Sequence, residues 1–530
     1  MVSHQNAGAY QKLKSLFSDI HALEKAGAVL EWDMVAQMRS GSADDRDHQL
    51  ETLAAMVHDK LSAPQVADWL DEAESNLASL SAGDQANLRH MRHTHAHSTA
   101  LPADLVRALT AQAAEGQRLH KNILKSGNWE DALPAFRNGL ELARQQGAAI
   151  QSALGLSSPY AGLLNAYCPD MGPEELDKQI SVLEPRLTKL LPDVMARQSE
   201  QPEPLPITTG FSEQSQKVIC EKICTDLGFD FDRGRLDFID DHPASYGTPD
   251  DSRITARFSP DNFLQLIYDT IHEVGHGCYE QGLPKDLRNQ PAGGPMGMDV
   301  HESQSLMYEF QLGKSEAFCE YLGRLLKPLA DNPSDPALEP ENLYALQTRV
   351  VRSPIRISME TSELTYPLHI MLRYKLEKDM ISGDLDPADL PEAWNNMMED
   401  LIGVTPQTPR ESHIQDVHWF VGYWGYFPTY LLGAMGTAQL YSAAKDQNPD
   451  MEAGFAKGDF QPLIRWLRDN VHSKGSLLTT PELFRQSTGQ PLDSGLYLDH
   501  LTGRYNTRPS DRPEPTSSRT PGGLKLDFGS

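Results

Sequence analysis

The chain has 530 residues, of which 39% are hydrophobic and 23% are charged, as expected of a globular protein with a large core. Its 47 basic and 74 acidic residues give a net charge of −27. A negative field of this size repels nucleic acids and anionic membranes. No run approaches the roughly 18 uninterrupted apolar residues of a membrane span, and the N-terminus does not resemble a secretory signal. We therefore expect a soluble protein without nucleic-acid or membrane partners.

The cysteines indicate the redox environment. There are five, at positions 168, 220, 224, 278 and 319. An odd, sparse set in a long chain is not typical of a disulfide framework. Cys220 and Cys224 have helical spacing, but no second pair follows to complete a structural zinc site. We expect reduced thiols and a cytoplasmic protein.

Hydrophobic residues recur at helical spacing along most of the chain. The first run contains Leu13, Phe17 and Ile20, and similar runs follow at 84–124 and 174–198, punctuated by proline and glycine. Only 230–258 alternates loosely between turn signals, which predicts a sheet of two or three strands. We predict a mainly α protein in which residues 1–506 form one large helical domain with a small β-sheet. The tail, 507–530, is rich in Pro, Ser and Gly and is expected to be disordered.

The segment that starts at Ser259 has the features of a buried helix. Ser259 offers an N-cap oxygen, Pro260 presets the backbone, and Asp261 places an acid near the positive end of the helix dipole. The apolar residues that follow form a wide surface suited to burial: Phe263, Leu264, Leu266, Ile267, Ile271 and Val274.

This helix carries the motif HExxH as HEVGH. His272 and His276 lie about 40° apart around the axis and one turn apart along it, so both imidazoles can reach a single ion. Glu273 lies within about 60° of His276, where its carboxylate can serve as a general base toward water on that ion. The competing interpretation is two buried histidines bonded to the backbone. Because the motif lies on a capped amphipathic helix, we favour the metal site over this alternative.

A catalytic zinc needs a third protein ligand and an open position. The downstream candidates are Glu280, Asp299, His301, Glu302 and Glu309. A Gly/Pro-rich loop leads into a second helical run, 300–322, and Glu302 at its head could turn back onto the first helix. Any single acid on this helix could also be a solvated carboxylate.

At HEVGHGCYEQGL followed by HESQS, the sequence resembles the thermostable carboxypeptidase Taq family of zinc carboxypeptidases. DSRIT at 251–255 matches that family's DxRxT motif. QDVHW at 415–419 and GYFPTYLLG at 425–433 resemble its C-terminal signature. The likeness extends over about residues 8–506, and the set of ordered motifs is highly specific.

This resemblance implies a helical peptidase domain with a cleft between two mostly helical halves and the small sheet near the active site. It implies a carboxypeptidase that releases single amino acids from peptides with a free C-terminus, and a homodimer. One Zn²⁺, or another divalent ion such as Co²⁺, is expected on His272, His276 and Glu302, with Glu273 as the catalytic base. His301 and Gln304 are expected to orient the ligands.

Three motifs depart from the family pattern. The HPF motif reads His242-Pro243-Ala244 and loses its aromatic residue. The I(R/A)xxAD segment aligns with Ile355–Glu360, where Met-Glu replaces Ala-Asp. Ser412 stands where glycine is usual in GxxQDxHW. These changes leave the zinc ligands untouched, but they could alter residue preference or substrate fit.

Recognition of a free carboxylate calls for a guanidinium, which offers paired hydrogen bonds. Arg253, in DSRIT, is the first candidate and Arg356 the second, although either could form a structural ion pair instead. A developing oxyanion needs neutral or cationic donors. His418, Tyr426 and Tyr430 carry such donors, and ordinary core packing is the alternative for each.

Two other functions compete with this one. An endo-acting zinc oligopeptidase of similar helical-cleft fold would suit Gly275 in HEVGH, whereas HESQS and QDVHW favour the carboxypeptidase. A non-catalytic zinc-binding scaffold has no need of a general base, so Glu273 argues against it.

Overall fold

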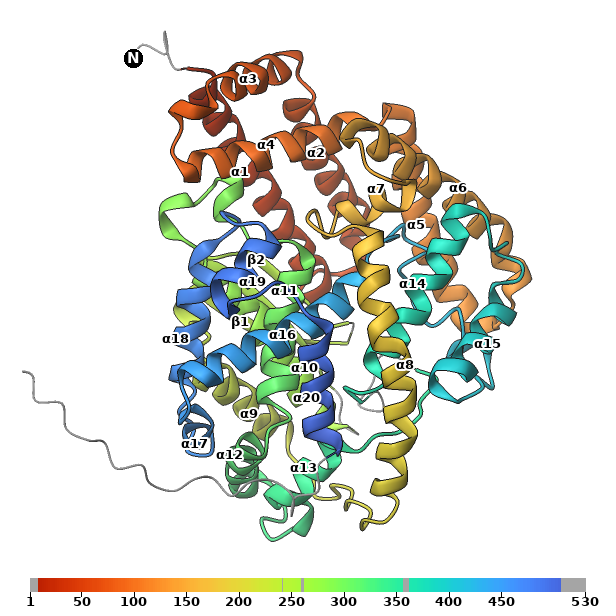
Figure 1. The fold of residues 1–530 in the computed structure, drawn as a ribbon, viewed down its shortest axis with the longest axis vertical. Helices are drawn as coiled ribbons and strands as arrows, with labels where there is room; N and C mark the ends of the chain where they lie inside the picture. The colour runs from red at the N-terminus through yellow and green to blue at the C-terminus, as the bar shows by residue number, and fades with distance from the viewer. Residues whose placement is uncertain (1–7, 241, 259–261, 356–361, 507–530) are drawn as a thin grey trace, which may run out of the picture.

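The computed structural model describes residues 8–240, 242–258, 262–355 and 362–506. Within these ranges the chain forms 20 α-helices and one three-stranded sheet, which confirms the predicted mainly α fold (Figure 1). The tail 507–530, predicted to be disordered, lies outside the described residues, so the division into one domain and a tail stays a prediction. None of the helices in the described ranges combines the length and hydropathy that a bilayer-spanning segment needs.

The helices are α1 (Ala9–Ala36), α2 (Ala43–Leu61), α3 (Pro64–Ser75), α4 (Ala82–Ala100), α5 (Ala103–Ser126), α6 (Trp129–Leu154), α7 (Pro159–Asn165), α8 (Pro173–Gln198), α9 (Glu213–Asp226), α10 (Phe263–Gly282), α11 (Met298–Leu306), α12 (Glu316–Leu326), α13 (Pro340–Thr348), α14 (Tyr366–Ser382), α15 (Leu390–Ile402), α16 (Pro428–Gln447), α17 (Met451–Phe455), α18 (Gln461–Asn470), α19 (Thr480–Thr488) and α20 (Ser494–Asn506). The strands are β1 (Gly234–Ile239), β2 (Ser245–Thr248) and β3 (Asp251–Arg257).

The predicted helical runs correspond to observed helices. The first run is α1, and 174–198 is α8. The run 84–124 is divided into α4 and α5, because Leu101 and Pro102 adopt extended backbone between them. Proline removes a backbone donor and disfavours helical geometry in the residue before it, so the break falls at this point.

Apolar side chains gather into two large cores and a small one. The first large core joins α6, α7, α8, α14, α15 and α20, and the second joins α9, α10, α12, α18 and α19. The small core holds α1, α3 and α4 together. Helices α11 and α16 pack against each other and contribute to both large cores. On α11, for example, Leu306 lies in the first core and Val300 in the second, so this helix sits where the two halves meet.

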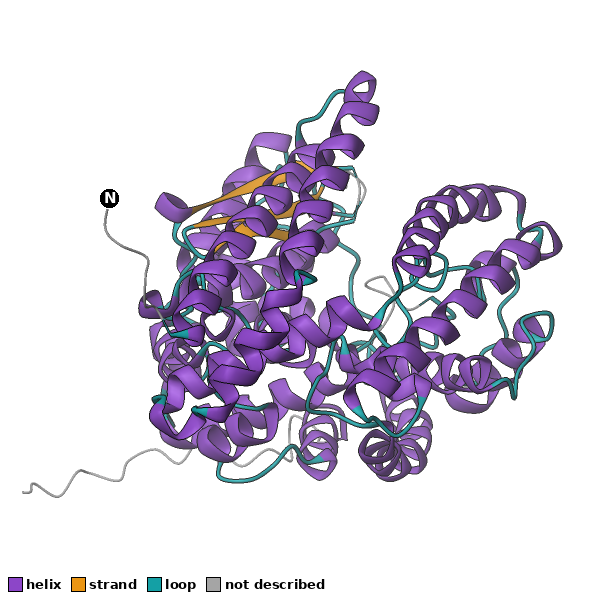
Figure 2. Ribbon diagram, turned by 90° about the horizontal axis from the view of Figure 1, so that it is seen from above, coloured by secondary structure: helices purple, strands orange, loops and turns teal. Residues whose placement is uncertain are grey.

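The small sheet has the order β1-β3-β2, with β1 parallel and β2 antiparallel to β3. It lies in one half of the molecule and is enclosed by helices (Figure 2). The register pairs Arg235 of β1 with Arg253 of β3. Both guanidinium groups stack on Trp32 of α1, at 4.6 Å and 4.2 Å from its ring centroid. The indole Nε1 also donates to Asp237 at 3.1 Å, so Trp32 ties α1 to the sheet.

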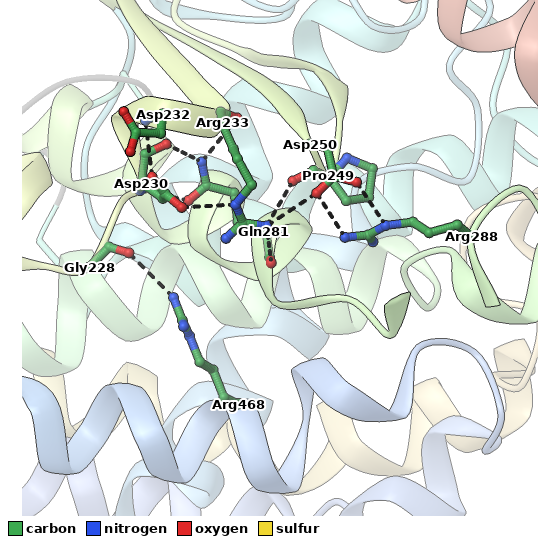
Figure 3. A network of polar contacts seen from close by, with 9 residues as sticks. All are labelled: Gly228, Asp230, Asp232, Arg233, Pro249, Asp250, Gln281, Arg288 and Arg468. Carbon is green, nitrogen blue, oxygen red and sulfur yellow. Dashed lines mark hydrogen bonds and ion pairs between the residues drawn. The ribbon is translucent and has the colours of Figure 1, made fainter. Parts of the chain in front are cut away.

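A polar network fastens the sheet to the end of α10 (Figure 3). Arg233, just before β1, donates to Asp230 at 2.8 Å and to the carbonyl oxygen of Gln281 on α10 at 3.2 Å. It also reaches Asp250 in the β2–β3 turn at 3.3 Å, and Arg288 donates to the same carboxylate at 3.2 Å. The helix that carries HExxH is therefore anchored at its C-terminal end to the sheet beside it.

Candidate active site

Helix α10 presents the HExxH residues to the interior. It begins at Phe263, and Asn262 is its N-cap, with its side chain accepting from the backbone N–H of Gln265. The predicted cap, Ser259, lies outside the described residues. Most of the helix is buried, as its wide apolar surface predicts, and the rings of His272 and His276 lie 5.0 Å apart between centroids.

Glu302, on α11, completes a cluster with the two histidines. Its Oε2 lies 3.9 Å from Nε2 of His272 and 3.5 Å from Nε2 of His276. One donor atom from each of the three residues lies within 4.8 Å of the other two. Two imidazoles and one carboxylate at this spacing are a donor set that catalytic zinc accepts.

The other candidate ligands have different partners. Glu280 contacts Nε2 of His301 at 3.2 Å, and Asp299 is buried away from the cleft. Glu309 receives a hydrogen bond from Nδ1 of His272 at 2.7 Å. A carboxylate on the second ring nitrogen fixes the tautomer that leaves Nε2 free to ligate an ion.

Two glycines give this cluster its shape. A β-carbon at Gly275 would lie 2.5 Å from the backbone oxygen of Gln304, so glycine at this position lets α10 and α11 approach closely. A β-carbon at Gly433 of α16 would lie 2.8 Å from Cγ of Glu302. The glycine in HEVGH therefore has a packing reason that does not depend on the kind of peptidase.

The electrostatics of the cluster favour a cation. Although burial opposes it, the negative charges of Glu302 and Glu309 raise the pKa of His272 to about 10. Burial alone would raise the pKa of Glu302, but the neighbouring His272 and His276 outweigh this effect and lower the pKa to about 2. Burial, together with the neighbouring His301, lowers the pKa of His276 to about 4, so this imidazole stays neutral.

Glu273 is buried beside the cluster and lines the same cleft. Within the described part of the chain its Oε2 has no hydrogen-bond partner. Burial raises the pKa of Glu273 to about 8; His272 opposes this shift, and the carboxylate of Glu302 adds to it. A carboxyl group poised near neutral pH, with a free oxygen facing a cleft, suits a general base.

The cleft over the cluster has a volume of about 500 Å³. Its walls include residues from both large cores, among them Tyr268 of α10 and Tyr366 of α14. The model of the carboxypeptidase Taq (M32) metallopeptidase family matches residues 12–505. The chain belongs to this family.

Individual relatives agree over the same length. Thermostable carboxypeptidase 1 of Thermus thermophilus is 31% identical over 506 residues, which cover 94% of this chain and 98% of that protein. Carboxypeptidase 1 of Bacillus subtilis is 28% identical and covers 93% of this chain and 97% of its own. Metallocarboxypeptidase 1 of Trypanosoma cruzi superposes with a TM-score of 0.91 at 31% identity, covering 94% of this chain and 99% of that one. The M32 carboxypeptidase of Deinococcus radiodurans gives 0.87 at 30%, with the same coverage.

In this M32 metallopeptidase, two of the three predicted oxyanion donors line the cleft. Tyr426 and Tyr430 face it, with ring centroids 5.4 Å apart. Burial, with the nearby Tyr430 and Glu302, raises the pKa of Tyr426 well above its usual range, so its hydroxyl stays protonated. His418 does not line the cleft; its Nε2 lies 3.4 Å from the hydroxyl of Tyr430.

His301 and Gln304 were expected to orient the ligands, and the structure gives each of them different contacts. The ring of His301 packs 4.5 Å from that of His276, between centroids, while its Nε2 contacts Glu280. Gln304 contacts none of the three ligands through its amide. Its Nε2 donates to Ser303 at 2.9 Å, and its Oε1 lies 3.1 Å from Nε2 of His472.

The first candidate for carboxylate recognition lies outside the cleft. Arg253 donates to Asp251 at 2.8 Å and stacks on Trp32, which is the structural ion pair left open above. The parallel register with β1 explains this position, since it holds Arg253 beside Arg235 on the face toward α1. Arg356, the second candidate, lies outside the described residues.

Two of the three departures from the family motifs fall on described residues, one in the cleft wall and one in the buried interior. His242, Pro243 and Ala244 all line the cleft, so the missing aromatic ring changes the cleft wall itself. Ser412 is buried, and its hydroxyl donates to Asn395 at 2.8 Å.

Sequence reasoning missed the lysine and the arginines that line the cleft, and one exposed tyrosine. Arg257, Lys314 and Arg349 line the cleft, as does the exposed Tyr423. Lys314 lies five residues after Glu309 in the run 300–322, and a basic residue in a run that follows a candidate ligand is the signal that could have found it. Arg257 ends the strand that carries DSRIT, and Arg349 follows α13, where no motif singled it out.

Proposed function

We propose that the chain is a zinc-dependent carboxypeptidase that hydrolyses the last peptide bond of peptides and releases single amino acids. One observation carries this proposal: donor atoms of His272, His276 and Glu302 lie within 4.8 Å of one another beside Glu273, a buried carboxyl group without a partner in the described structure. The names of the relatives support the activity on the C-terminal residue.

The residues present fit a divalent cation. The set of two imidazoles and one carboxylate suits zinc, and a cation beside Glu273 would favour the charged form of that carboxyl group. A bound divalent ion would polarise the scissile carbonyl and lower the pKa of a water molecule. The identity of the ion belongs to the proposal, with Zn²⁺ first and Co²⁺ as the alternative.

Glu273 has the proton-transfer role in this proposal. Its carboxylate takes a proton from the attacking water and then delivers that proton to the leaving amine. A pKa raised by burial suits both steps, because the group can hold the proton between them. Low exposure also excludes bulk water, which would otherwise compete for the proton.

Tyr426 and Tyr430 have the donor role. Both residues line the cleft, and a hydroxyl kept protonated, as that of Tyr426 is, can stabilise the negative charge that develops on the carbonyl oxygen without itself ionising. The contact between Tyr430 and His418 supports a positioning role for the histidine.

The decisive experiment is a time course of free amino acids released from an unblocked peptide, with and without a chelator. We expect sequential release from the C-terminus, abolished by chelation and by amidation of the C-terminus. Internal fragments from a peptide blocked at both ends would instead support the endo-acting oligopeptidase. Glu273→Gln is expected to keep stoichiometric metal and to lose turnover by at least about 100-fold; unchanged turnover would refute its role.

The setting of the enzyme also belongs to the proposal. We infer peptides with a free C-terminus as its partners, a cytoplasmic location, and a homodimer without nucleic acid or membrane. All five cysteines are free and buried, which supports a reducing compartment. Light scattering of the purified protein would test the homodimer.

A further inference from the structure

Helix α4 carries a second pair of histidines at the spacing of those in HExxH. His93 and His97 are four residues apart in RHMRHTHAH at 89–97, and their ring centroids lie 4.4 Å apart. Residues at this spacing lie one turn apart on the same side of a helix. Both rings are partly exposed, and neither belongs to the described wall of the cleft. The pair is therefore separate from the candidate active site.

Both imidazoles converge on one atom of another helix. Nε2 of His93 and Nε2 of His97 each lie 2.8 Å from Oδ1 of Asn165, the last residue of α7. The ligand atoms of a tetrahedral zinc ion lie about 2.0–2.1 Å from the metal and so about 3.3 Å from one another. Each of the two N–O separations is within about 0.5 Å of that value, so small rotations of the side chains would admit an ion.

The other end of the Asn165 amide fixes which atom faces the rings. Its Nδ2 donates to the carbonyl oxygen of Pro169 at 3.1 Å. A carbonyl oxygen only accepts, so the amide oxygen has to point the opposite way, toward the two imidazoles. Asn165 is 7% exposed, and its side chain is held in this direction by the surrounding protein. The oxygen is thus in place before any ion binds.

The protonation of the rings also suits a metal, which binds the neutral form of histidine. Burial lowers the pKa of His97; the contact with Asn165 opposes this shift, and the nearby His93 adds to it. Among the described residues no carboxylate lies within ion-pairing distance of either ring. In the same part of the chain neither Nδ1 has a hydrogen-bond partner, so each ring can carry its proton there and leave Nε2 to an ion.

We propose that His93, His97 and Asn165 bind a divalent transition-metal ion such as Zn²⁺, with water in the remaining positions. Two imidazole nitrogens and one amide oxygen suit zinc and its neighbours in the first transition row. Mg²⁺ and Ca²⁺ prefer sets made only of oxygen atoms, with carboxylates among them, and are not expected here. The partial exposure of both rings gives an ion access from solvent.

An ion at this position would join two parts of the fold. Helix α4 belongs to the small core and α7 to the first large core. Tyr167, two residues after Asn165, packs edge-on against Tyr426 of the cleft wall, with 4.9 Å between ring centroids. Its carbonyl oxygen accepts from the backbone N–H of Met298, the first residue of α11, at 2.8 Å. The ion would therefore clamp α4 to the segment that supports the cleft, and we expect it to stabilise the folded protein.

Equilibrium dialysis of the untagged full chain against micromolar Zn²⁺ tests the site. The wild type should bind one equivalent more than His93→Ala or His97→Ala, and the double variant should lose no more than either single one, because the two side chains share one ion. Added Zn²⁺ should also raise Tm more in the wild type than in His97→Ala. This difference between variants does not depend on what binds in the cleft, so the inference and the proposed function can fail separately.

His95→Ala is the matched control. His95 lies on the same helix between the two proposed ligands and is also partly exposed, but it makes no contact with Asn165 in the described structure. This variant should bind as much Zn²⁺ as the wild type. Unchanged stoichiometry in both His93→Ala and His97→Ala would overturn the inference and leave the two imidazoles as hydrogen-bond donors to Asn165. Loss of the same equivalent in His95→Ala would also overturn it, by showing general adsorption on α4.

A measurement without mutation covers the case in which a variant does not fold. Modification of the wild-type chain with diethyl pyrocarbonate, followed by mass spectrometry, reports on each histidine separately. Zn²⁺ should slow the modification of His93 and His97 and leave that of His95 unchanged. Equal rates for His93 and His97 with and without Zn²⁺ would overturn the inference.

Discussion

Gly433 of α16 faces the side chain of Glu302 so closely that a β-carbon at this position would lie 2.8 Å from Cγ and 2.9 Å from Cβ of the glutamate. This carboxylate of the candidate metal site is thus held against bare backbone. A side chain at position 433 would clash with Glu302, so either this glutamate or α16 has to shift.

Gly433→Ala should therefore weaken metal binding. We expect the affinity for Zn²⁺ to fall by about 10- to 100-fold, as when a supporting residue of a metal site is lost. Competition with a chelating dye measures this. Gly436→Ala, one turn along α16, is the control, since its β-carbon would meet Phe484 at 2.8 Å instead. Equal metal affinity in the two variants would contradict the prediction.

Glu309→Gln should also weaken the metal site, through His272. The carboxylate accepts from Nδ1 at 2.7 Å, and its charge increases the basicity of the ligating nitrogen. We expect a fall of about 10-fold or more in metal affinity, with activity recovering in excess Zn²⁺. Glu320 on α12 is exposed, so Glu320→Gln should change neither the metal affinity nor the activity. Activity that stays low at saturating metal would point to a different role for Glu309.

Tyr426→Phe should lower kcat more than it raises KM. A hydroxyl that acts on the developing oxyanion contributes mainly in the transition state, so kcat is expected to fall by about 10- to 100-fold. Metal content and thermal stability should stay close to wild type. A loss confined to KM would show instead that Tyr426 contacts the substrate equally in the ground state.

Glu377 should give stability a pH dependence. Burial raises the pKa of Glu377 to about 7, although Tyr160, Trp419 and the backbone N–H of Gly425 donate to it. Between the unfolded pKa of 4.5 and about 7, the folded state keeps a proton that the unfolded state has released. Stability therefore falls as pH rises through this window, by about 3 kcal/mol in total, and levels off above it.

Glu377→Gln removes this titration while Trp419 and Gly425 can still donate to the amide oxygen. Urea unfolding at pH 5 and pH 8 should show a smaller loss of stability in the variant than in the wild type. The difference between the two proteins isolates Glu377 from the other titrating groups. The same pH dependence in both would contradict the raised pKa.

Part of the site follows from local sequence alone. The i, i+4 spacing of His272 and His276 fixes their common face once the segment is helical, and Glu273 must then project beside them. The family motifs added Glu302, which spacing alone could not choose from five candidates. The helical class and the small sheet at 230–258 follow from hydrophobic periodicity, because burial of one face imposes the period of each element.

Other features depend on segments far apart in the chain. Arg253 looked suited to binding a carboxylate, yet the register of β1 with β3 places it beside Arg235 over Trp32, more than 200 residues away in sequence. The partner of a charged side chain is set by which strands and helices pack together, and a motif does not record this.

The amino-acid sequence by itself determined the helical class and the common face of His272 and His276 with Glu273 beside them, since all of these arise from spacing within single elements. Only the tertiary structure decided the rest: that Glu309 contacts His272, that Gly433 makes room for Glu302, and that Arg253 stacks on Trp32 outside the cleft. The physical reason is that hydrogen bonds, close contacts and desolvation act between neighbours in space, and here those neighbours come from helices that the chain brings together only on folding.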